Sequence, residues 1–168
     1  MAVSAKSVKV RDSLRSKLAR VRDGHAPRVL DLFAGCGGMS LGAQLAGCEV
    51  VGAVELDPVA ARSHALNFHS REEVHGIGRD ISKTDPVALL DELGIASANP
   101  RDRIDVLVGG PPCQAFARVG RAKLREVREH PEAFLHDPRS GLYRDYLRFV
   151  EALSPLIVVV ENVPDVLN

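Results

Sequence analysis

The chain has 168 residues, of which 45% are hydrophobic and 26% are charged, and its 22 basic residues balance its 22 acidic ones. This composition is typical of one soluble globular domain, and no apolar run approaches the ~20 residues that a membrane helix needs. The three cysteines include no Cys-x-x-Cys pair, which argues against a disulfide framework or a metal site and favours a reducing compartment such as the cytoplasm.

The first 27 residues are predicted to form a basic N-terminal helix or arm. Residues 1–23 hold seven Lys or Arg and two Asp or Glu, and apolar side chains recur at helical spacing at Val10, Leu14, Leu18 and Val21. We expect this helix to lay one stripe on the domain. A nucleic-acid-binding arm and an organelle-transit segment stay open as alternatives, whereas the lack of an apolar core argues against a secretory signal.

From residue 28 onward, short apolar runs alternate with helical patterns. This alternation predicts an α/β fold over residues 28–168, with a parallel sheet flanked by helices. The segment 118–138 is the least regular, and we expect a long loop with some helix there. The runs typical of strands lie at 28–34, 49–55, 74–81, 103–110 and 155–163, and the helical patterns lie at 39–47, 58–68, 85–94 and 139–153.

Four of the predicted strands end in residues with distinctive chemistry. These ends are Phe33-Ala34-Gly35, Glu55, the turn before Cys113, and Glu161-Asn162. Because ligands of parallel sheets bind at the carboxyl ends of the strands, we expect these four ends to lie along one edge and to form the functional site.

A glycine-rich turn follows the first of these strands. Gly35, Gly37 and Gly38 let the backbone approach a ligand closely, and Glu55 ends the next strand, where an acid could hold ribose hydroxyls. A dinucleotide site has the same outline, but Ser40 stands where the third glycine of that motif belongs. An ordinary glycine turn with a solvated acid also stays open.

The stretch GGPPCQAFARVG, residues 109–120, displays one thiol after a rigid turn. Pro111 and Pro112 fix the backbone before Cys113, and several basic residues follow, which would favour a reactive thiolate. A rigidly held thiol suits covalent attack, although an ordinary buried cysteine is the simpler interpretation. Glu161 at the neighbouring strand end is a candidate proton or hydrogen-bond donor.

These motifs together resemble the cytosine-5 DNA methyltransferases. The sequences DLFAGCGGMSLG, AVELDP, GRDI, GGPPCQAFARVG and PLIVVVENV occur in the order and spacing of that family, over residues 28–164. The resemblance implies a Rossmann-like fold that binds S-adenosylmethionine (SAM), and it implies DNA methylation at cytosine, of the kind found in bacterial restriction-modification systems.

The resemblance also implies roles for particular residues. Cys113 would add to carbon 6 of a cytosine flipped out of the duplex, Glu161 would hold the edge of that base, and Asn162 would orient the cysteine turn. The cofactor-binding residues that match the family pattern are Phe33, Gly35, Gly37, Glu55, Leu56, Asp80, Ile81, Pro112 and Leu142.

The chain departs from the family pattern in two ways. Ala117 follows Phe116 where the family often has Ser, and the sequence ends at Asn168, before the family's remaining strands, its Gln-x-Arg-x-Arg segment and its target-recognition region. We therefore expect a sheet that is incomplete at its C-terminal end, and weak or no methylation by this chain alone. A fragment of a longer protein, one subunit of a split enzyme that a second subunit completes, and a degenerate remnant all stay open. A tRNA cytosine-5 methyltransferase, an inactive SAM-binding fragment and a nicotinamide oxidoreductase stay open as alternatives.

Overall fold

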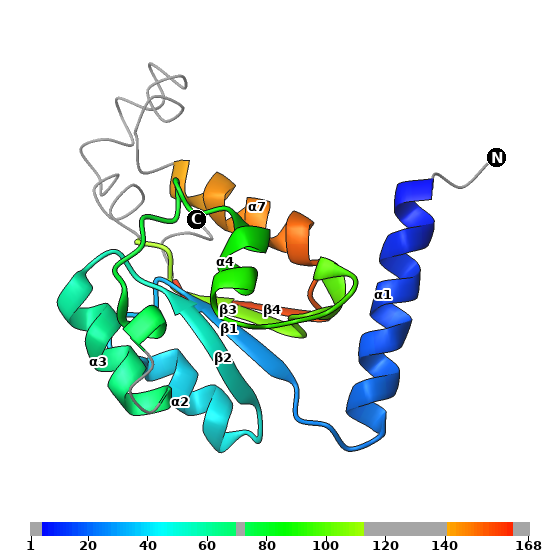
Figure 1. The fold of residues 1–168 in the computed structure, drawn as a ribbon, viewed down its shortest axis with the longest axis horizontal. Coiled ribbons are helices and arrows are strands. Elements are labelled where there is room, and N and C mark those ends of the chain that lie inside the picture. Colours follow the sequence, from blue (N-terminus) through cyan, green and yellow to red (C-terminus); the bar gives the residue numbers. More distant parts are fainter. Residues whose placement is uncertain (1–4, 70–72, 113–140, 163–168) are drawn as a thin grey trace.

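The computed structural model describes residues 5–69, 73–112 and 141–162, along which helices and strands alternate (Figure 1). Cys113 and the predicted loop at 118–138 lie outside these ranges. The elements are α1 (Ala5–Arg22), β1 (Arg28–Leu32), α2 (Gly38–Leu45), β2 (Glu49–Val54), α3 (Pro58–Phe68), η1 (Glu73–Gly76), α4 (Pro86–Glu92), η2 (Pro100–Asp102), β3 (Val106–Gly109), α7 (Gly141–Leu153) and β4 (Ile157–Val160).

The four strands run parallel in one sheet, in the order β2-β1-β3-β4. Leu32 at the end of β1 lies opposite Val54 of β2 and Gly109 of β3, and Gly109 lies opposite Val160 of β4. The carboxyl ends of all four strands therefore reach the same edge of the sheet. The predicted α/β fold, with a parallel sheet flanked by helices, is confirmed.

Apolar side chains pack on both faces of this sheet (Figure 1). On one face, α4 and α7 cover the strands, and the fully buried Leu107 and Phe149 belong to the larger core cluster. On the other face, α2 and α3 cover mainly β1 and β2, and Val108 joins a smaller cluster against which Ala43 packs. Because successive side chains of β3 point to opposite faces of the sheet, β3 contributes residues to both core clusters.

One predicted strand does not form. Residues 74–81 hold η1 and a loop instead of a strand. A Cβ atom at Gly78 would lie 2.9 Å from the carbonyl oxygen of Leu56 and 3.2 Å from the Cα of Pro58. Glycines offer no side chain to pack in a strand, and here they let the chain cross closely over the loop that follows β2.

The helix boundaries follow local capping chemistry. Asp57 and Asp85 each accept hydrogen bonds from two backbone N–H groups of the first turn, in α3 and α4 respectively, and each is followed by a proline. Gly94, with φ +69°, lies just beyond the end of α4. These starts and this end match the sequence-based predictions.

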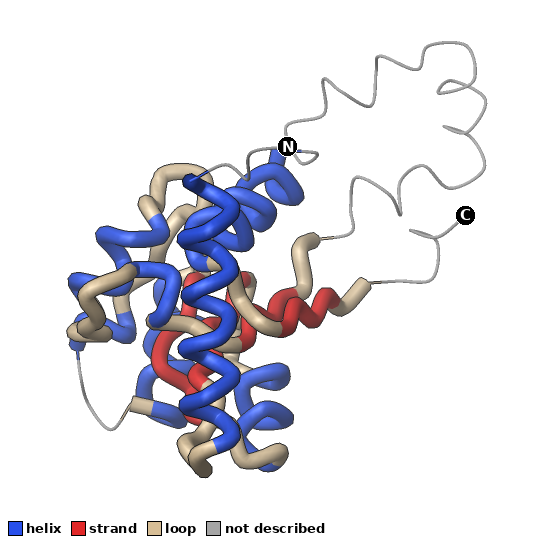
Figure 2. Tube along the Cα trace, turned by 90° about the vertical axis from the view of Figure 1, so that its right-hand side faces the viewer, coloured by secondary structure: helices blue, strands red, loops and turns tan. Residues whose placement is uncertain are grey.

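Helix α1 docks through a mixed face, on which Val10, Leu14 and Val21 of the predicted stripe are partly buried. Figure 2 shows this helix from its outer side, running along the domain. Its fully buried residues are Ser13 and Lys17, whereas Leu18 of the predicted apolar stripe is 43% exposed. The Lys17 ammonium group donates hydrogen bonds to the carbonyl oxygens of Leu153 (3.0 Å) and Ser154 (2.9 Å), at the end of α7. Burial lowers the pKa of Lys17 to about 8.

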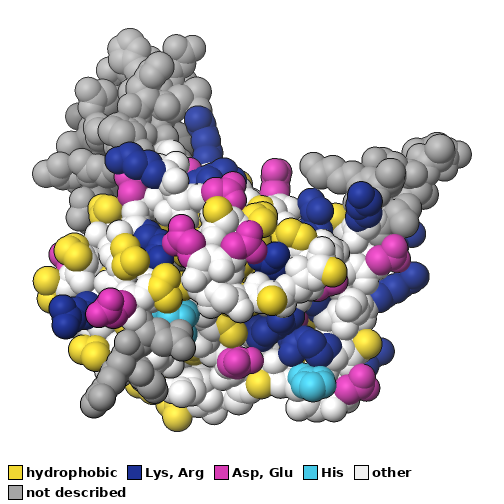
Figure 3. All heavy atoms as spheres, in the orientation of Figure 1, with side chains coloured by type: hydrophobic (Ala, Val, Ile, Leu, Met, Phe, Trp, Pro, Cys, Tyr) yellow, Lys and Arg dark blue, Asp and Glu magenta, His cyan; other side chains and the backbone are white. Residues whose placement is uncertain are grey.

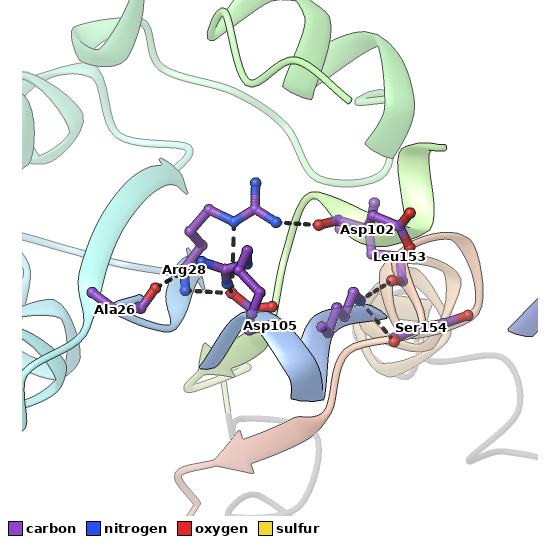
Figure 4. A network of polar contacts seen from close by, with 8 residues as sticks. Ala26, Arg28, Asp102, Asp105, Leu153 and Ser154 are labelled. Atoms are coloured by element: carbon purple, nitrogen blue, oxygen red, sulfur yellow. Dashed lines mark hydrogen bonds and ion pairs between the residues drawn. The ribbon is translucent and has the colours of Figure 1, made fainter. Parts of the chain in front are cut away.

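Asp105 joins α1 to the amino ends of the strands (Figure 4). Its buried carboxylate accepts hydrogen bonds from the backbone N–H of Arg28 (2.6 Å) and from the guanidinium group of Arg20. Its carbonyl oxygen accepts one from the N–H of Leu156, directly before β4 (2.7 Å). One residue therefore ties α1, β1, β3 and β4 together at the edge opposite the strand ends.

Strand β4 lies at the border of the described sheet. Its four residues, Ile157–Val160, are apolar and 43–55% exposed, whereas all four residues of β3 are buried. Within the ranges given above, no strand pairs with the outer edge of β4. None of the helices in the described part of the chain has both the length and the apolar character needed to cross a membrane.

Candidate functional site

The site begins where β1 ends. Phe33 has a left-handed backbone conformation (φ 60°), and its N–H group bonds to the carbonyl oxygen of Val54 at 2.8 Å. Such a conformation costs energy in a residue with a bulky side chain, and the surrounding hydrogen bonds hold it in place. The turn directs the chain into the glycine loop rather than along the strand.

The glycine loop packs closely against α3. Gly35 and Gly37 have φ values of 54° and 102°, which favour glycine. A Cβ atom on Gly37 would overlap the ring of Phe68 and lie 3.0 Å from Cδ2 of His64. Gly37 is therefore needed both for its backbone conformation and for the close approach of α3.

Glu55 holds this loop from the end of β2. One carboxylate oxygen accepts a hydrogen bond from the Gly35 N–H (2.8 Å), and the other accepts one from the Asp57 N–H (2.9 Å). A carboxylate has about four lone-pair positions, so Glu55 retains capacity to accept bonds from ligand hydroxyl groups.

A cavity of about 290 Å³ opens beside Glu55. Seven of the predicted cofactor-binding residues line it together with three residues that the motif analysis did not identify, whereas Gly35 and Gly37 are not among the lining residues. Exposed apolar side chains occur over α3 and the adjoining loops (Figure 3), and the exposed apolar residues of these segments include Val59 and Ile77. The cavity is lined by Phe33, Val54, Glu55, Leu56, Arg79, Asp80, Ile81, Gly110, Pro112 and Leu142.

Asp80 presents a second carboxylate at this cavity. Its Oδ1 atom accepts hydrogen bonds from the hydroxyl (2.7 Å) and the backbone N–H (3.0 Å) of Ser82, and Lys83 lies 3.2 Å away. These interactions lower the pKa of Asp80, and the hydrogen bond from the Ser82 hydroxyl has the largest effect. Asp80 is therefore ionised at neutral pH.

Helix α7 supports the same loop from the other side. Arg148 donates hydrogen bonds to the carbonyl oxygens of Ile81 (2.6 Å) and Thr84 (2.9 Å), and Leu142 of the same helix lines the cavity. The loop that carries Asp80 and Ile81 is thus fixed to α7 by its backbone as well as by packing.

Two of the three predicted catalytic residues, Glu161 and Asn162, directly follow the end of β4. Cys113 itself lies outside the described residues. Glu161 is exposed and follows β4 directly, and its Oε2 atom would be 3.1 Å from a Cβ on Gly110, so it lies against the turn that leads to Cys113. The Asn162 amide donates a hydrogen bond to the Tyr143 hydroxyl.

Arg79 is a lining residue that sequence reasoning missed. Its guanidinium group donates to Glu92 of α4 (3.1 Å) and to the carbonyl oxygen of Ile77 (3.2 Å), and its N–H bonds to the carbonyl oxygen of Glu55 at 2.6 Å. The sequence signal that could have identified Arg79 is its position directly before Asp80, a predicted cofactor-binding residue. No group of three or more potential metal ligands occurs among the residues that the structure describes.

Comparisons with known proteins agree with this geometry. The family model described as "C-5 cytosine-specific DNA methylase" matches residues 27–168. The type II methyltransferase M.DdeI of Desulfomicrobium norvegicum is 35% identical, over 83% of this chain and 28% of its own length. The type II methyltransferase M.HgiGI of Herpetosiphon aurantiacus is 34% identical, over 81% of this chain and 90% of its own length.

A solved structure shows the same similarity. A protein described as a DNA modification methyltransferase encoded within an E. coli prophage aligns with a TM-score of 0.60 and 33% identity, over 85% of this chain and 34% of that chain. The chain thus spans about a third of the length of the M.DdeI and prophage proteins.

Proposed function

The chain belongs to the C-5 cytosine-specific DNA methylase family, and on this basis we propose that it forms the cofactor-binding and catalytic part of an enzyme that methylates carbon 5 of cytosine in DNA. The observation that carries the proposal is the cavity at the carboxyl ends of the strands. It gathers residues, from Phe33 to Leu142, that are more than a hundred positions apart in the sequence and that the family resemblance had assigned to the cofactor.

The residues of this cavity suit SAM. Phe33, Leu56 and Ile81 offer apolar contacts to an adenine ring, and the carboxylate of Glu55 can accept bonds from ribose hydroxyls. Asp80 and Ile81 would read the edge of the adenine. When bound, SAM supplies a methyl group that is activated by the positive charge on its sulfur.

Cys113 and Glu161 would act on the cytosine. The Cys113 thiolate adds to carbon 6, which leaves carbon 5 electron-rich, and carbon 5 then takes the methyl group. A base would then take the proton from carbon 5, and the bond between carbon 6 and the Cys113 sulfur would break, which releases the thiolate and restores the ring. Glu161 would hold the N3 and amino edge of the base while the adduct forms, and Asn162 would keep the cysteine turn in place.

The DNA substrate needs more polypeptide than the described domain contains. We propose that the target cytosine is flipped out of a duplex, and that a target-recognition region on a further segment or a second subunit delivers it. The exposed β4 supports this, because an unpaired apolar strand edge favours an added strand.

The relatives' names place the proposal in a biological setting. Both M.DdeI and M.HgiGI are named type II methyltransferases, which favours a role in a bacterial restriction-modification system, in the cytoplasm. The family description names DNA, so the tRNA alternative is not favoured. An inactive SAM-binding fragment differs from the proposed enzyme in one respect, since it would form no covalent bond to cytosine.

Covalent trapping distinguishes these outcomes. The chain would be incubated with SAM and a pool of random duplexes that contain 5-fluorocytosine, alone and with the polypeptide encoded directly downstream. Fluorine cannot leave carbon 5 as a cation, so we expect a denaturation-resistant protein–DNA adduct when the completing polypeptide is present.

Two cysteine variants are the matched controls. Cys113→Ser should abolish the adduct, whereas Cys48→Ser, which changes a partly buried free thiol directly before β2 and outside the cavity lining, should leave it unchanged. An adduct that survives Cys113→Ser would overturn the assigned nucleophile, and the absence of any adduct with the completing polypeptide would overturn the proposed activity.

A further inference from the structure

A buried chain of three polar side chains runs beneath the glycine loop. Asp31 of β1, Ser40 of α2 and His64 of α3 are each at most 1% exposed. The Ser40 hydroxyl oxygen lies 2.6 Å from Oδ2 of Asp31 and 2.8 Å from Nε2 of His64. None of the three lines the cavity, so none of them touches a ligand bound there.

The direction of these hydrogen bonds follows from the groups themselves. Burial raises the pKa of Asp31 to about 6, so its carboxylate is ionised at pH 7 and can only accept, and Ser40 therefore donates its one hydroxyl hydrogen to Asp31. Ser40 must then accept from His64, whose Nε2 atom therefore carries the hydrogen. Burial lowers the pKa of His64 to about 4, so the ring is neutral at pH 7 and this single tautomer is favoured.

The same histidine packs against the glycine loop. Its Cδ2 atom would lie 3.0 Å from a Cβ on Gly37, beside the Phe68 ring. Three positions further along α3, the Asn67 amide donates to the carbonyl oxygen of Cys36 at 3.3 Å. One face of α3 thus contacts the loop at the two consecutive residues Cys36 and Gly37. Through its hydrogen bond to Ser40, His64 also connects α3 to α2.

We propose that His64 is a positioning residue for the cofactor, which holds the Cys36–Gly38 loop in its binding conformation through its hydrogen bond to Ser40 and its contact with Gly37. The inference rests on the proposed binding of SAM. A loop fixed before binding loses less conformational freedom when the ligand arrives, and it therefore binds more tightly.

Two substitutions separate the hydrogen bond from the packing. His64→Leu removes the donor and keeps apolar volume, and we expect about tenfold weaker SAM binding in calorimetry. His64→Gln can place an amide donor near the position of Nε2, and we expect it to restore most of the affinity. Leu66→Ala, which alters a 63% exposed residue of α3, is the control and should bind as the wild type does.

Amide hydrogen exchange provides a measurement without ligand. In His64→Leu, the amides of Gly37–Leu41 should exchange faster, whereas those of β3 should be unchanged. Urea unfolding of each variant establishes that binding is measured on folded protein. Where His64→Leu does not fold, Ser40→Cys, which keeps the volume but bonds weakly, should show the same loss of affinity.

The outcomes are distinguishable. Wild-type protein that does not bind SAM would overturn the proposed cofactor and this inference together. If the wild type binds SAM, and folded His64→Leu or Ser40→Cys binds it with the same affinity, the inference is overturned and the proposed cofactor is not. Equal losses in His64→Leu and His64→Gln would also overturn it, because the hydrogen bond would then not be the cause.

Discussion

Glu55 connects the end of β2 to both the glycine loop and the start of α3. Its two carboxylate oxygens each accept one backbone hydrogen bond, from Gly35 and from Asp57. A carboxylate is needed for this arrangement because both of its oxygens are acceptors, whereas a side-chain amide offers one acceptor and one donor.

Replacing Glu55 with glutamine tests its role in ligand binding. In Glu55→Gln, one of the two backbone N–H groups faces an NH₂ group, and the charge that would hold ribose hydroxyls is lost. We expect about tenfold weaker SAM binding in calorimetry. Glu49→Gln, at the exposed start of the same strand, should leave the affinity unchanged, and an equal loss in both variants would contradict the assignment.

Some residues of the site could be predicted from the sequence, and others could not. Glu55 was predictable because it ends an apolar run typical of a strand, and chemistry in parallel sheets concentrates there, whereas Asp80 was identified only through the resemblance to the family. His64 could not be predicted, because nothing in a helical pattern distinguishes a histidine that contacts another element from one that faces water. In the sequence, Ser40 is notable only because it replaces the third glycine of the dinucleotide-binding motif, yet its hydroxyl group joins β1 to α3.

At the scale of elements, α1 shows how a helix can dock by hydrogen bonds. Lys17 extends its buried ammonium group to two carbonyl oxygens at the end of α7, where unpaired carbonyls and the helix dipole favour a cation. The apolar spacing in the sequence predicted the helix and most of the face that docks, but it did not predict that Ser13 and Lys17 are the most deeply buried residues of that face. From the sequence alone, a lysine is expected to lie in solvent, because the acceptors that surround it in the fold are not known.

Lys17→Met should destabilise the protein. Methionine keeps much of the length but leaves the carbonyl oxygens of Leu153 and Ser154 without their donor, and we expect a loss of about 1–3 kcal/mol in the free energy of unfolding, measured in urea at pH 7. Lys9→Met, on the exposed side of α1, should change it by less than about 0.5 kcal/mol.

The pH dependence of stability gives Lys17→Met a second readout. Because the folded-state pKa of Lys17 is lowered from 10.5 to about 8, the unfolded chain binds the proton more tightly between these values. The contribution of Lys17 to stability therefore rises as the pH rises through this window, and Lys17→Met should lack that rise. Identical pH profiles for the two proteins would contradict the buried position of the ammonium group.

Other elements were predicted correctly where local chemistry decides them. The starts of α3 and α4 and the four strands follow from short-range patterns. The segment 74–81 was predicted as a strand, but its apolar residues do not alternate, and its Gly78 serves close packing against Leu56 and Pro58 instead of strand pairing. Only the neighbouring elements distinguish these two uses of glycine.

At the scale of the whole molecule, the described sheet has one border that is covered poorly. The side chains of β4 remain about half exposed, and they form an apolar row along an unpaired backbone edge. Such an edge attracts any compatible strand, including that of another copy of the chain.

We therefore expect the isolated chain to self-associate through β4. Sedimentation velocity should show an increase in average mass with concentration, and Val159→Lys should reduce it, because a lysine on a strand edge opposes pairing. Val59→Lys makes the same change at a 73% exposed position of α3 and should have no effect. Association that is insensitive to Val159→Lys would place the contact elsewhere.

The Asp105 network and the cavity lie at opposite ends of the same strands, separated by about 15 Å. Free-energy effects of substitutions this far apart usually add. Directed evolution could therefore treat the two ends as separate problems. A library of variants at the amino ends of the strands can be selected for expression or thermal tolerance alone. The selected variants can then be combined with substitutions that alter the cofactor or base preference, without repeating the selection.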